Sequence, residues 1–438
     1  MSEPNSIDAL VSALRGRREV DEWVAAARAR SITIVRHGAG SEERRTDDRT
    51  EARATVHRDL PAGRGTARVR VIGGAIGPAL DDAIARAVFG VGPPWQMAPP
   101  AAPAQVETSD PALTADAAEQ IATRAYAVAR TPEMTRLAGG KVEVDDVAVE
   151  VARERVDLAS SQGLHVQWNA TEAHVVVTIR ATGRTAIARA RSRQLESLGV
   201  NAAIASAAEQ LGARAAAVAP VPGAYPIVMR LDALAPCDGT LGVWAAFAAQ
   251  ADAALVRQGL SRYRPGHPIV EDATQVAEPI TIVSDGALPF GLASVPVGDE
   301  AEPVRRFTLV ERGVAREVAY TQREAALAGA RPNGGVRNLV VDGGATPASS
   351  LAQGGPLIDV ASFAWIEIDP RTAQLSAGIE LAYLRGDHGA TPITGGVIRG
   401  DAIAALARAV RSSETATRGA YQGPIAIRTP PLELATRA

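Results

Sequence analysis

The segment from Lys141 to Val151 reads KVEVDDVAVEV, so valine alternates with residues that are mostly acidic. The same two-residue period returns at Leu164–Val166–Trp168 and at Val175–Val177–Ile179. Alternation of apolar and polar residues is typical of antiparallel strands with one face on a core and the other in water. The stretch 141–191 therefore predicts an antiparallel sheet of several strands.

Helices and further strands are predicted on both sides of this sheet. Thr114 precedes an apolar helical pattern and is suited to cap a helix, because its side-chain oxygen can accept a hydrogen bond from the first turn. A Pro-rich segment, about 90–111, is expected to be an extended surface connection. The elements expected in this half are helices at 7–14, 20–30, 78–89, 114–129 and 202–218, strands at 31–35 and 67–72, and a charged loop or polar hairpin tip at 40–53.

The segment APVPG at 219–223 marks the expected domain boundary. We expect an α+β fold, in which an N-terminal α/β domain with an antiparallel sheet (1–220) precedes a β-rich C-terminal domain with a few helices (221–438). Length is a weak guide to domain number, but 438 residues suit two domains. The elements expected in the second half are strands at 225–230, 280–283, 307–311, 336–341, 363–368, 379–384 and 425–429, and helices at 240–257, 323–328 and 401–410.

Composition excludes several classes of protein. The chain is 46% hydrophobic and 22% charged, with a net charge of -3, which suits a globular protein rather than a disordered one or a nucleic-acid binder. Cys237 is the only cysteine, so neither an intramolecular disulfide nor a cysteine-based metal cluster can form. The N-terminus does not resemble a signal peptide, and prolines interrupt the longest uncharged run, 87–106. We expect a cytoplasmic protein without a membrane span.

No catalytic, cofactor-binding or metal-binding residue emerges from the motifs. His267 and Glu271 have a helical metal spacing, but the flanking prolines exclude a helix. His165 and His174 are expected to be ordinary sheet residues on adjacent strands. The remaining histidines, His37, His57 and His388, lie in no ligand pattern.

Two weaker motifs carry alternatives. Cys237 precedes a predicted helix, where a thiol pKa can be lowered, yet no partner for a nucleophile is identifiable. Asp387 could orient His388, but again without a nucleophile. Gly73, Gly74 and Gly77 lie between a strand and a helix and are interpreted as turn residues, because no dinucleotide fingerprint surrounds them.

Several stretches in a consistent order resemble the TldD/PmbA family of peptidase-related proteins, and more closely its PmbA (TldE) branch. The resemblance extends from about residue 50 to the end, and Ala301 stands where this family usually has glycine. The stretches that carry it are Gly63–Val71, Leu158–Gly163, Ala207–Leu211, Ser284–Glu300, Thr308–Val314, Arg323–Gly329, Arg337–Gly344, Ala377–Glu380 and Pro392–Gly400.

The resemblance implies a chain without its own zinc. The zinc-bearing branch carries His-Glu-x-x-x-His on the helix after the first strand of the C-terminal domain, and a late cysteine ligand. The corresponding segments here, Thr240–Val256 and Tyr421–Pro424, contain no histidine, glutamate or cysteine. Zinc needs about three protein ligands in a fixed geometry, so the family's ligands cannot be carried over.

The family therefore implies a non-catalytic, metal-free subunit of a heterodimeric TldD/TldE-type peptidase. Its partner would be a zinc-bearing TldD-like paralogue, and its substrate an unfolded or short peptide bound by β-strand addition inside a closed chamber. Whether the chain is itself an enzyme stays open. The alternatives are a homodimeric binding or scaffold protein and a metal-independent hydrolase that uses Cys237 or an unrecognised site.

Overall fold

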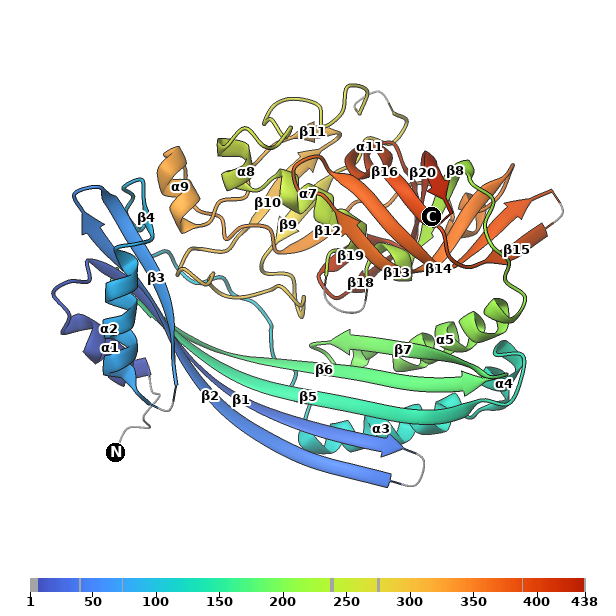
Figure 1. The fold of residues 1–438 in the computed structure, drawn as a ribbon, viewed down its shortest axis with the longest axis horizontal. Coiled ribbons are helices and arrows are strands. Elements are labelled where there is room, and N and C mark those ends of the chain that lie inside the picture. The colour runs from blue at the N-terminus through green and yellow to red at the C-terminus, as the bar shows by residue number, and fades with distance from the viewer. Residues whose placement is uncertain are drawn as a thin grey trace.

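The computed structural model describes residues 7–38, 41–72, 74–236, 240–273, 276–387 and 389–436. A long curved sheet and its helices form the N-terminal part, and two further sheets with short helices form the C-terminal part (Figure 1). The predicted α+β fold is confirmed: the first sheet is antiparallel, and the C-terminal part is rich in strands. None of the helices described in the chain combines the length and the apolar character needed to cross a membrane.

The N-terminal part is built on a seven-stranded sheet with the order β4-β3-β2-β1-β5-β6-β7. Its elements, in chain order, are α1 (Ile7–Arg15), β1 (Glu22–Gly38), β2 (Ser41–Leu60), β3 (Gly63–Val71), α2 (Ile76–Ala87), β4 (Val91–Gly92), α3 (Ala115–Ala129), α4 (Pro132–Leu137), β5 (Glu143–Ser160), β6 (His165–Ala181), β7 (Arg184–Ser192), the 3-10 helix η1 (Glu196–Leu198) and α5 (Val200–Ala215). The antiparallel sheet predicted within 141–191 is confirmed as β5, β6 and β7, but the two apolar runs 164–168 and 175–179 belong to the single strand β6.

The central strand β1 corrects one prediction. The segment 20–30 was expected to be a helix because of its alanines and their spacing, but Glu22–Gly38 is one continuous strand. It pairs along its length with β2 on one side and with β5 on the other. Helix propensities differ by less than about 1 kcal/mol per residue, so two complete ladders of backbone hydrogen bonds outweigh the preference of alanine.

The charged segment 41–53 is also part of a strand. It was expected to be a solvated loop or the polar tip of a hairpin, and only the hairpin interpretation agrees with the structure. Ser41 pairs with Gly38, and β2 follows β1 as the second arm of the hairpin. The side chains at 41–46 are exposed, so the strand is held by its backbone pairing and not by an apolar face.

Helices cover one face of this sheet. Apolar residues of α3, α4 and α5 pack on alternate residues of β5 and β6, among them Val149 and Val175. Leu80 of α2 packs at the other end of the sheet, with Trp23 of β1. The Thr114 hydroxyl accepts a hydrogen bond from the Ala117 backbone N–H at 3.1 Å, so the predicted cap is confirmed. The opposite face of the sheet is left to meet the C-terminal part.

The Pro-rich connection joins the two parts. It is extended, as predicted, but it does not lie wholly on the surface. Trp95 and Met97 are buried in a cluster with Val24 of β1 and Val297 of the C-terminal part. Ala104 donates a backbone hydrogen bond to Pro296. The surface interpretation therefore holds for most of the segment but is wrong at Trp95 and Met97, which are covered from both sides.

The C-terminal part contains two sheets, of orders β11-β10-β9-β12-β19-β18 and β13-β8-β20-β16-β14-β15, with β17 attached to β20. One apolar core runs between these sheets and the helices α7 and α11. The elements are β8 (Gly223–Arg230), α6 (Leu231–Leu234), the 3-10 helix η2 (Gly242–Trp244), α7 (Ala245–Gln250), α8 (Ala253–Arg257), β9 (Ile282–Asp285), β10 (Arg306–Glu311), β11 (Val314–Ala315), α9 (Gln322–Ala328), β12 (Asn338–Val341), α10 (Ala348–Leu351), β13 (Leu357–Ile368), β14 (Gln374–Gly386), β15 (Gly389–Ile393), β16 (Val397–Asp401), α11 (Ala402–Ala407), β17 (Val410–Arg411), β18 (Thr415–Arg418), β19 (Tyr421–Pro424) and β20 (Ala426–Ala435).

The helix predicted at 240–257 is broken into three short pieces, η2, α7 and α8. Asp252 causes the last break, because its carboxylate accepts the backbone N–H groups of Ala254 and Leu255 and so begins a new helix. Asp252 also forms a bridge to Ala319, which holds the chain extended at that point.

Charged contacts fix the C-terminal part against the N-terminal sheet. Asp299 accepts a hydrogen bond from Arg53 at 2.7 Å and lies 3.5 Å from Arg28. The neighbouring Glu300 binds Arg68 at 2.6 Å. The nearby guanidinium groups hold the pKa of Asp299 below its usual range, against the opposing effect of burial. This loop is thereby anchored to β1, β2 and β3.

Candidate functional site

The two segments that the sequence comparison singled out for metal ligands meet inside the C-terminal core. Trp244, at the end of η2, stacks on Tyr421 of β19 with ring centroids 5.7 Å apart and an interplanar angle of 18°. Phe247 of α7 also stacks on Trp244, with ring centroids 6.3 Å apart. All three side chains are fully buried. The meeting point is therefore a packed aromatic cluster.

The atoms of this cluster do not fit a zinc ion. Zinc in proteins takes cysteine sulfur, histidine nitrogen or carboxylate oxygen. The indole Nε1–H of Trp244 is a donor only, and it is buried without a partner among the described residues. The Tyr421 hydroxyl donates to the Pro424 carbonyl at 2.9 Å, and burial raises its pKa, so it stays protonated. Across the part of the chain that the structure describes, no three His, Cys, Asp or Glu side chains are grouped to hold a metal.

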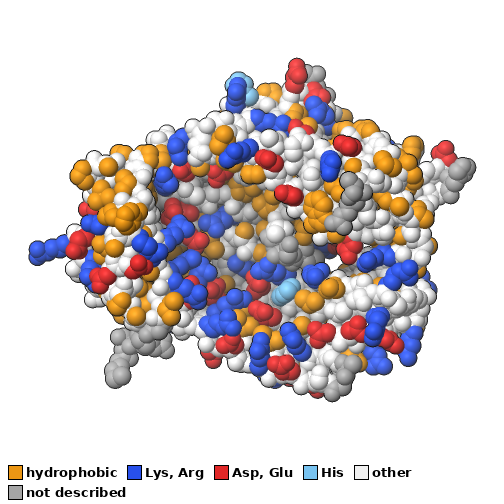
Figure 2. Space-filling view, viewed as in Figure 1, with side chains coloured by type: hydrophobic (Ala, Val, Ile, Leu, Met, Phe, Trp, Pro, Cys, Tyr) orange, Lys and Arg blue, Asp and Glu red, His pale blue; other side chains and the backbone are white. Residues whose placement is uncertain are grey.

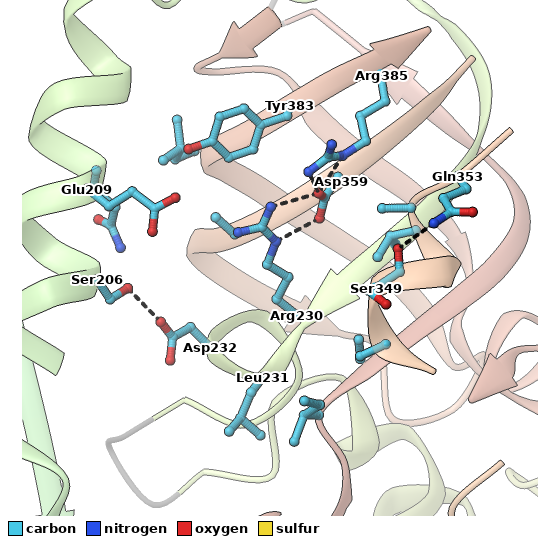
Figure 3. Close-up of a pocket in the computed structure, with 18 of the residues that line it drawn as sticks. Ser206, Glu209, Arg230, Leu231, Asp232, Ser349, Gln353, Asp359, Tyr383 and Arg385 are labelled. Atoms are coloured by element: carbon cyan, nitrogen blue, oxygen red, sulfur yellow. Dashed lines mark hydrogen bonds and ion pairs between the residues drawn. The ribbon is translucent and has the colours of Figure 1, made fainter. Parts of the chain in front are cut away.

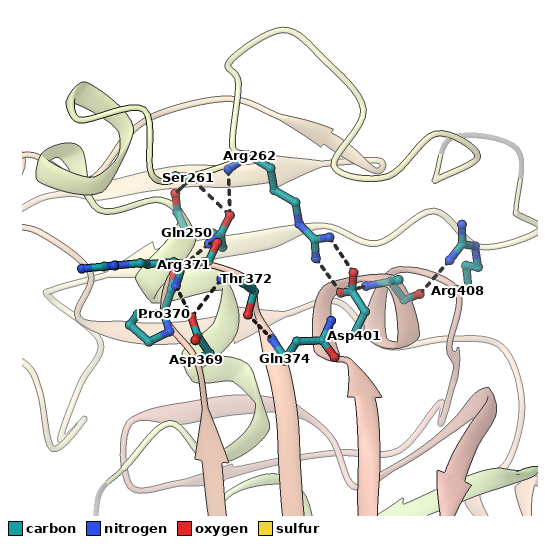
Figure 4. A network of polar contacts seen from close by, with 11 residues as sticks. Gln250, Ser261, Arg262, Asp369, Pro370, Arg371, Thr372, Gln374, Asp401 and Arg408 are labelled. Carbon is teal, nitrogen blue, oxygen red and sulfur yellow. Dashed lines mark hydrogen bonds and ion pairs between the residues drawn. The ribbon is translucent and has the colours of Figure 1, made fainter.

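The polar side chain at the end of α7 serves the fold. Gln250 is fully buried and donates from Nε2 to the carbonyls of Pro370 and Arg371, at 2.7 and 2.9 Å (Figure 4). Its Oε1 accepts the Arg262 backbone N–H at 3.0 Å. Gln250 thus ties α7 to the turn between β13 and β14 and to the segment that follows α8, which leaves it no atom for a substrate.

A cavity of about 760 Å³ opens between α5 of the N-terminal part and strands β8, β13 and β14 of the C-terminal part (Figure 3). Helix α10 and Arg418 of β18 complete its wall. Its volume lies within the roughly 300–1,000 Å³ that is usual for small-molecule sites. The cavity therefore joins both parts of the chain around a space of ligand size.

Two arginines hold one carboxylate at the base of this cavity. Arg230 donates from Nε and Nη2 to the two oxygens of Asp359, at 2.9 and 2.8 Å. Arg385 approaches Oδ2 of the same carboxylate with Nε and Nη2, both at 2.7 Å. The Asp359 side chain is 1% exposed, whereas those of Arg230 and Arg385 are 37% and 33% exposed. Both guanidinium groups also lie near the Tyr383 ring, 5.3 and 6.0 Å from its centroid.

Acidic residues line the opposite side of the cavity. Asp232 accepts the Ser206 hydroxyl at 2.9 Å and pairs with Arg418. Glu209 of α5 is exposed and points into the space in front of Tyr383 (Figure 3). Its charge contributes to a raised Arg230 pKa, whose largest cause is the hydrogen bond to Asp359. The cavity thus presents a cationic base and an acidic wall.

The face of the long sheet that the helices leave uncovered is charged and nearly neutral in balance. Arg191 of β7 donates to both oxygens of Glu172 on β6, at 2.9 and 3.1 Å. Arg30 of β1 donates to Glu150 of β5 at 3.3 Å. Figure 2 shows a hollow between the two parts, with basic and acidic side chains intermixed on its surface. Charged side chains on this face are thus paired between neighbouring strands.

The histidines fall in places that carry no shared chemistry. His165 and His174 both lie on β6, so their expected placement on adjacent strands is wrong; the run from 165 to 181 has no glycine or proline to divide it. The segment of His267 is not helical, in agreement with the prediction, and Pro268 forms a bridge to Val314. His57 is buried against Thr66 and Trp95. Cys237, Gly73 and His388 lie outside the described residues.

The cavity residues were not found by sequence reasoning. Arg230, Asp359 and Arg385 belong to three different strands, and no spacing between them could indicate that they meet. One indication was present: Asp359 is a lone acid in the apolar run LIDVASF, 357–363, and a buried carboxylate needs a cationic partner. Asp359 belongs to no histidine, cysteine or glycine motif that would mark a site.

Comparisons with known proteins agree on the fold. Residues 223–435 match the family model described as PmbA/TldA metallopeptidase C-terminal domain. The structure is similar to TldE from Thermococcus kodakarensis, with a TM-score of 0.76 and 16% identity over 98% of this chain and 100% of that one. A search of curated protein sequences finds no significant match.

Two further solved structures are similar over nearly their whole length, and both are described as proposed modulators of DNA gyrase. The protein from Thermotoga maritima has a TM-score of 0.74 and 16% identity, over 98% of this chain and 99% of that one. The protein from Bacteroides thetaiotaomicron has a TM-score of 0.78 and 12% identity, over 98% of each chain. At these identities the likeness concerns the fold.

Proposed function

Since the chain belongs to the TldD/PmbA family, with a metallopeptidase-type fold, we propose that it is the metal-free, non-catalytic subunit of a heterodimeric peptidase. Its partner is a zinc-bearing TldD-like paralogue. Its substrates are unfolded or short peptides, which the two chains enclose together. The partner's zinc supplies the chemistry, namely a polarised carbonyl and an activated water.

The observation that carries this proposal is the stack of Trp244 on Tyr421. The two segments where the family resemblance places metal ligands in the zinc-bearing branch lie side by side in this chain, which supports a scaffold of the same kind. The side chains that meet there, Trp244, Phe247 and Tyr421, are aromatic and fully buried. A chain that keeps the family fold but has packed aromatic side chains where the zinc-bearing branch has its ligands is expected to serve as a non-catalytic subunit of a complex.

The charged face of the long sheet supports the role of a chamber wall. A peptide that must enter the chamber, move inside it and leave again needs a polar, solvated wall without a large apolar patch that would bind it tightly. Pairs such as Arg191 with Glu172 provide charges that are already compensated, so the wall neither binds one peptide tightly nor repels another. Peptide selection would then depend on entry and on backbone pairing with strand edges.

Co-expression with a zinc-bearing family member from the same source tests the proposal. The expected result is a heterodimer on size-exclusion chromatography that cleaves an unfolded peptide substrate, whereas this chain alone is inactive. A contact on the order of 2,000 Å² or more is expected for such an obligate pair.

Matched controls separate the roles of the two chains. Replacing a zinc-ligand histidine of the partner with alanine should abolish cleavage but leave the complex intact. Replacing Trp365, an exposed tryptophan of this chain, with alanine should leave cleavage unchanged. If the zinc-bearing protein is fully active alone and never co-elutes with this chain, the heterodimer is wrong, and a homodimeric scaffold or an independent hydrolase takes its place.

A further inference from the structure

The cavity between α5 and the strands β8, β13 and β14 has the charge arrangement of a binding site for a zwitterion. We propose that it binds a short peptide, about two or three residues long, by its free C-terminal carboxylate. Arg230 and Arg385 hold the carboxylate, and Glu209 attracts the ammonium group at the other end.

The base of the cavity keeps one uncompensated positive charge. Two guanidinium groups share the single carboxylate of Asp359, which is almost completely buried. Both arginines use Nε and Nη2 for that carboxylate, and among the described residues neither Nη1 group donates a hydrogen bond. About a third of each arginine side chain is exposed, so these N–H groups can reach a ligand in the cavity.

The arginines are held in place before any ligand arrives. Each is fixed by two contacts to Asp359 and lies over the Tyr383 ring. A guanidinium that is already oriented loses little conformational entropy when it binds a second carboxylate. Asp359 therefore acts as an internal carboxylate that positions both arginines, and the ligand supplies the carboxylate that balances the remaining charge.

The acidic wall selects against a simple anion. Glu209 has no hydrogen bond or ion pair among the residues that the structure describes, and it projects from α5 into the cavity. Asp232 is already satisfied by Ser206 and Arg418. A phosphate dianion would meet one net positive charge at the base and the repulsion of Glu209 from the wall. A peptide with both termini free matches both signs.

Apolar residues between the charged ends suit the side chains of small residues. Val228, Leu381 and Ile425 line the cavity together with alanines of α10 and of neighbouring strands. A cavity of about 760 Å³ is larger than one amino acid requires, which favours a di- or tripeptide. The choice of a peptide over another zwitterion rests on the proposed function, whereas the charge pattern itself does not.

Isothermal titration of the purified full-length chain tests the site without any partner subunit. Ala-Ala is expected to bind, and amidation of its carboxyl group should weaken binding by about tenfold or more, the value of a lost charged hydrogen bond. Inorganic phosphate should bind at least about tenfold more weakly than Ala-Ala, because Glu209 opposes it. N-acetyl-Ala-Ala should bind a few-fold more weakly, as it lacks the ammonium group.

Variants assign the two ends. Arg385→Gln leaves Arg230 to neutralise Asp359 and should weaken Ala-Ala about tenfold. Glu209→Gln changes an exposed residue on the surface of α5. It should weaken Ala-Ala, which loses the partner of its ammonium group, but should leave N-acetyl-Ala-Ala unchanged or slightly tighter, because the repulsion of its single negative charge is removed. Arg184→Gln, an exposed arginine on β7 outside the cavity, is the control and should change nothing.

The proposal is overturned if Ala-Ala and its amide bind equally, if phosphate binds as well as Ala-Ala, or if Ala-Ala does not bind. It is overturned equally if Glu209→Gln affects both peptides alike. Since the titration uses this chain alone, a failure here leaves the heterodimer proposal standing. Failure to form the heterodimer, in turn, leaves the measured affinity standing.

Discussion

Replacing Trp244 with alanine should destabilise the C-terminal part strongly. Trp244 is fully buried and stacks on both Tyr421 and Phe247. Truncation of a buried tryptophan to alanine costs about 3–5 kcal/mol, because the apolar contacts are lost and a cavity stays behind. For a folding unit of about 150–250 residues each kcal/mol lowers Tm by about 2–4 °C, so we expect a drop of about 6–20 °C.

Differential scanning calorimetry of the purified chain, with a urea titration, measures this loss. The matched control is Trp365→Ala, which removes the same side chain from β13, where it is 40% exposed. The control should cost less than about 1 kcal/mol, since it opens no cavity. If Trp244→Ala lowers the transition no more than Trp365→Ala does, Trp244 is not a core residue. The argument that an aromatic cluster replaces a metal centre then fails.

Three more predictions address the metal, the buried histidine and the helix cap. Protein purified without chelator should contain only substoichiometric zinc by elemental analysis; about one tightly held zinc per chain would contradict the proposed role. Burial, with Arg64 and Arg68 nearby, lowers the pKa of His57 to about 3 from 6.5, so the folded state keeps His57 neutral while the unfolded chain takes up a proton below 6.5. Stability present at neutral pH should therefore fall as pH drops from 6.5 towards 3, by about 2 kcal/mol at pH 5; His57→Gln should lack this component, and an identical pH profile for both proteins would refute the assignment. Thr114→Ala should cost about 1 kcal/mol in urea unfolding, because the cap of α3 is lost, whereas Thr123→Ala on the exposed side of the same helix should be neutral or slightly stabilising.

Local sequence patterns were enough to predict a helix or strand wherever one of its faces is buried and the other is exposed to solvent. The alternation in 141–191 specified an antiparallel sheet of several strands, and the cap at Thr114 specified where α3 begins. The absence of histidine, glutamate and cysteine at 240–256 and 421–424 could likewise be read from the sequence alone. In each case the information sits within a few consecutive residues, because period and capping are properties of neighbours in the chain.

The candidate sites could not be located this way. No local feature of Trp244 indicates that it stacks on Tyr421, and the arginines of the cavity gain their meaning only from Asp359 on another strand. Sequence reasoning could state that the two segments lack histidine, glutamate and cysteine, yet not that they meet in a buried aromatic cluster. The single available indication, a lone acid in an apolar strand, shows that a cationic partner must exist but does not name it.

What the sequence by itself determined is the class of the fold, most of its local elements and the lack of zinc-ligand residues where the family resemblance places them. What only the tertiary structure decided is the state of segments whose local preference is weak or misleading, such as the alanine-rich β1 and the charged start of β2. Propensity differences of less than about 1 kcal/mol per residue yield to a complete backbone ladder on either side. The same non-local pairing sets β8, β13 and β14 side by side, and so brings Arg230, Asp359 and Arg385 to one point.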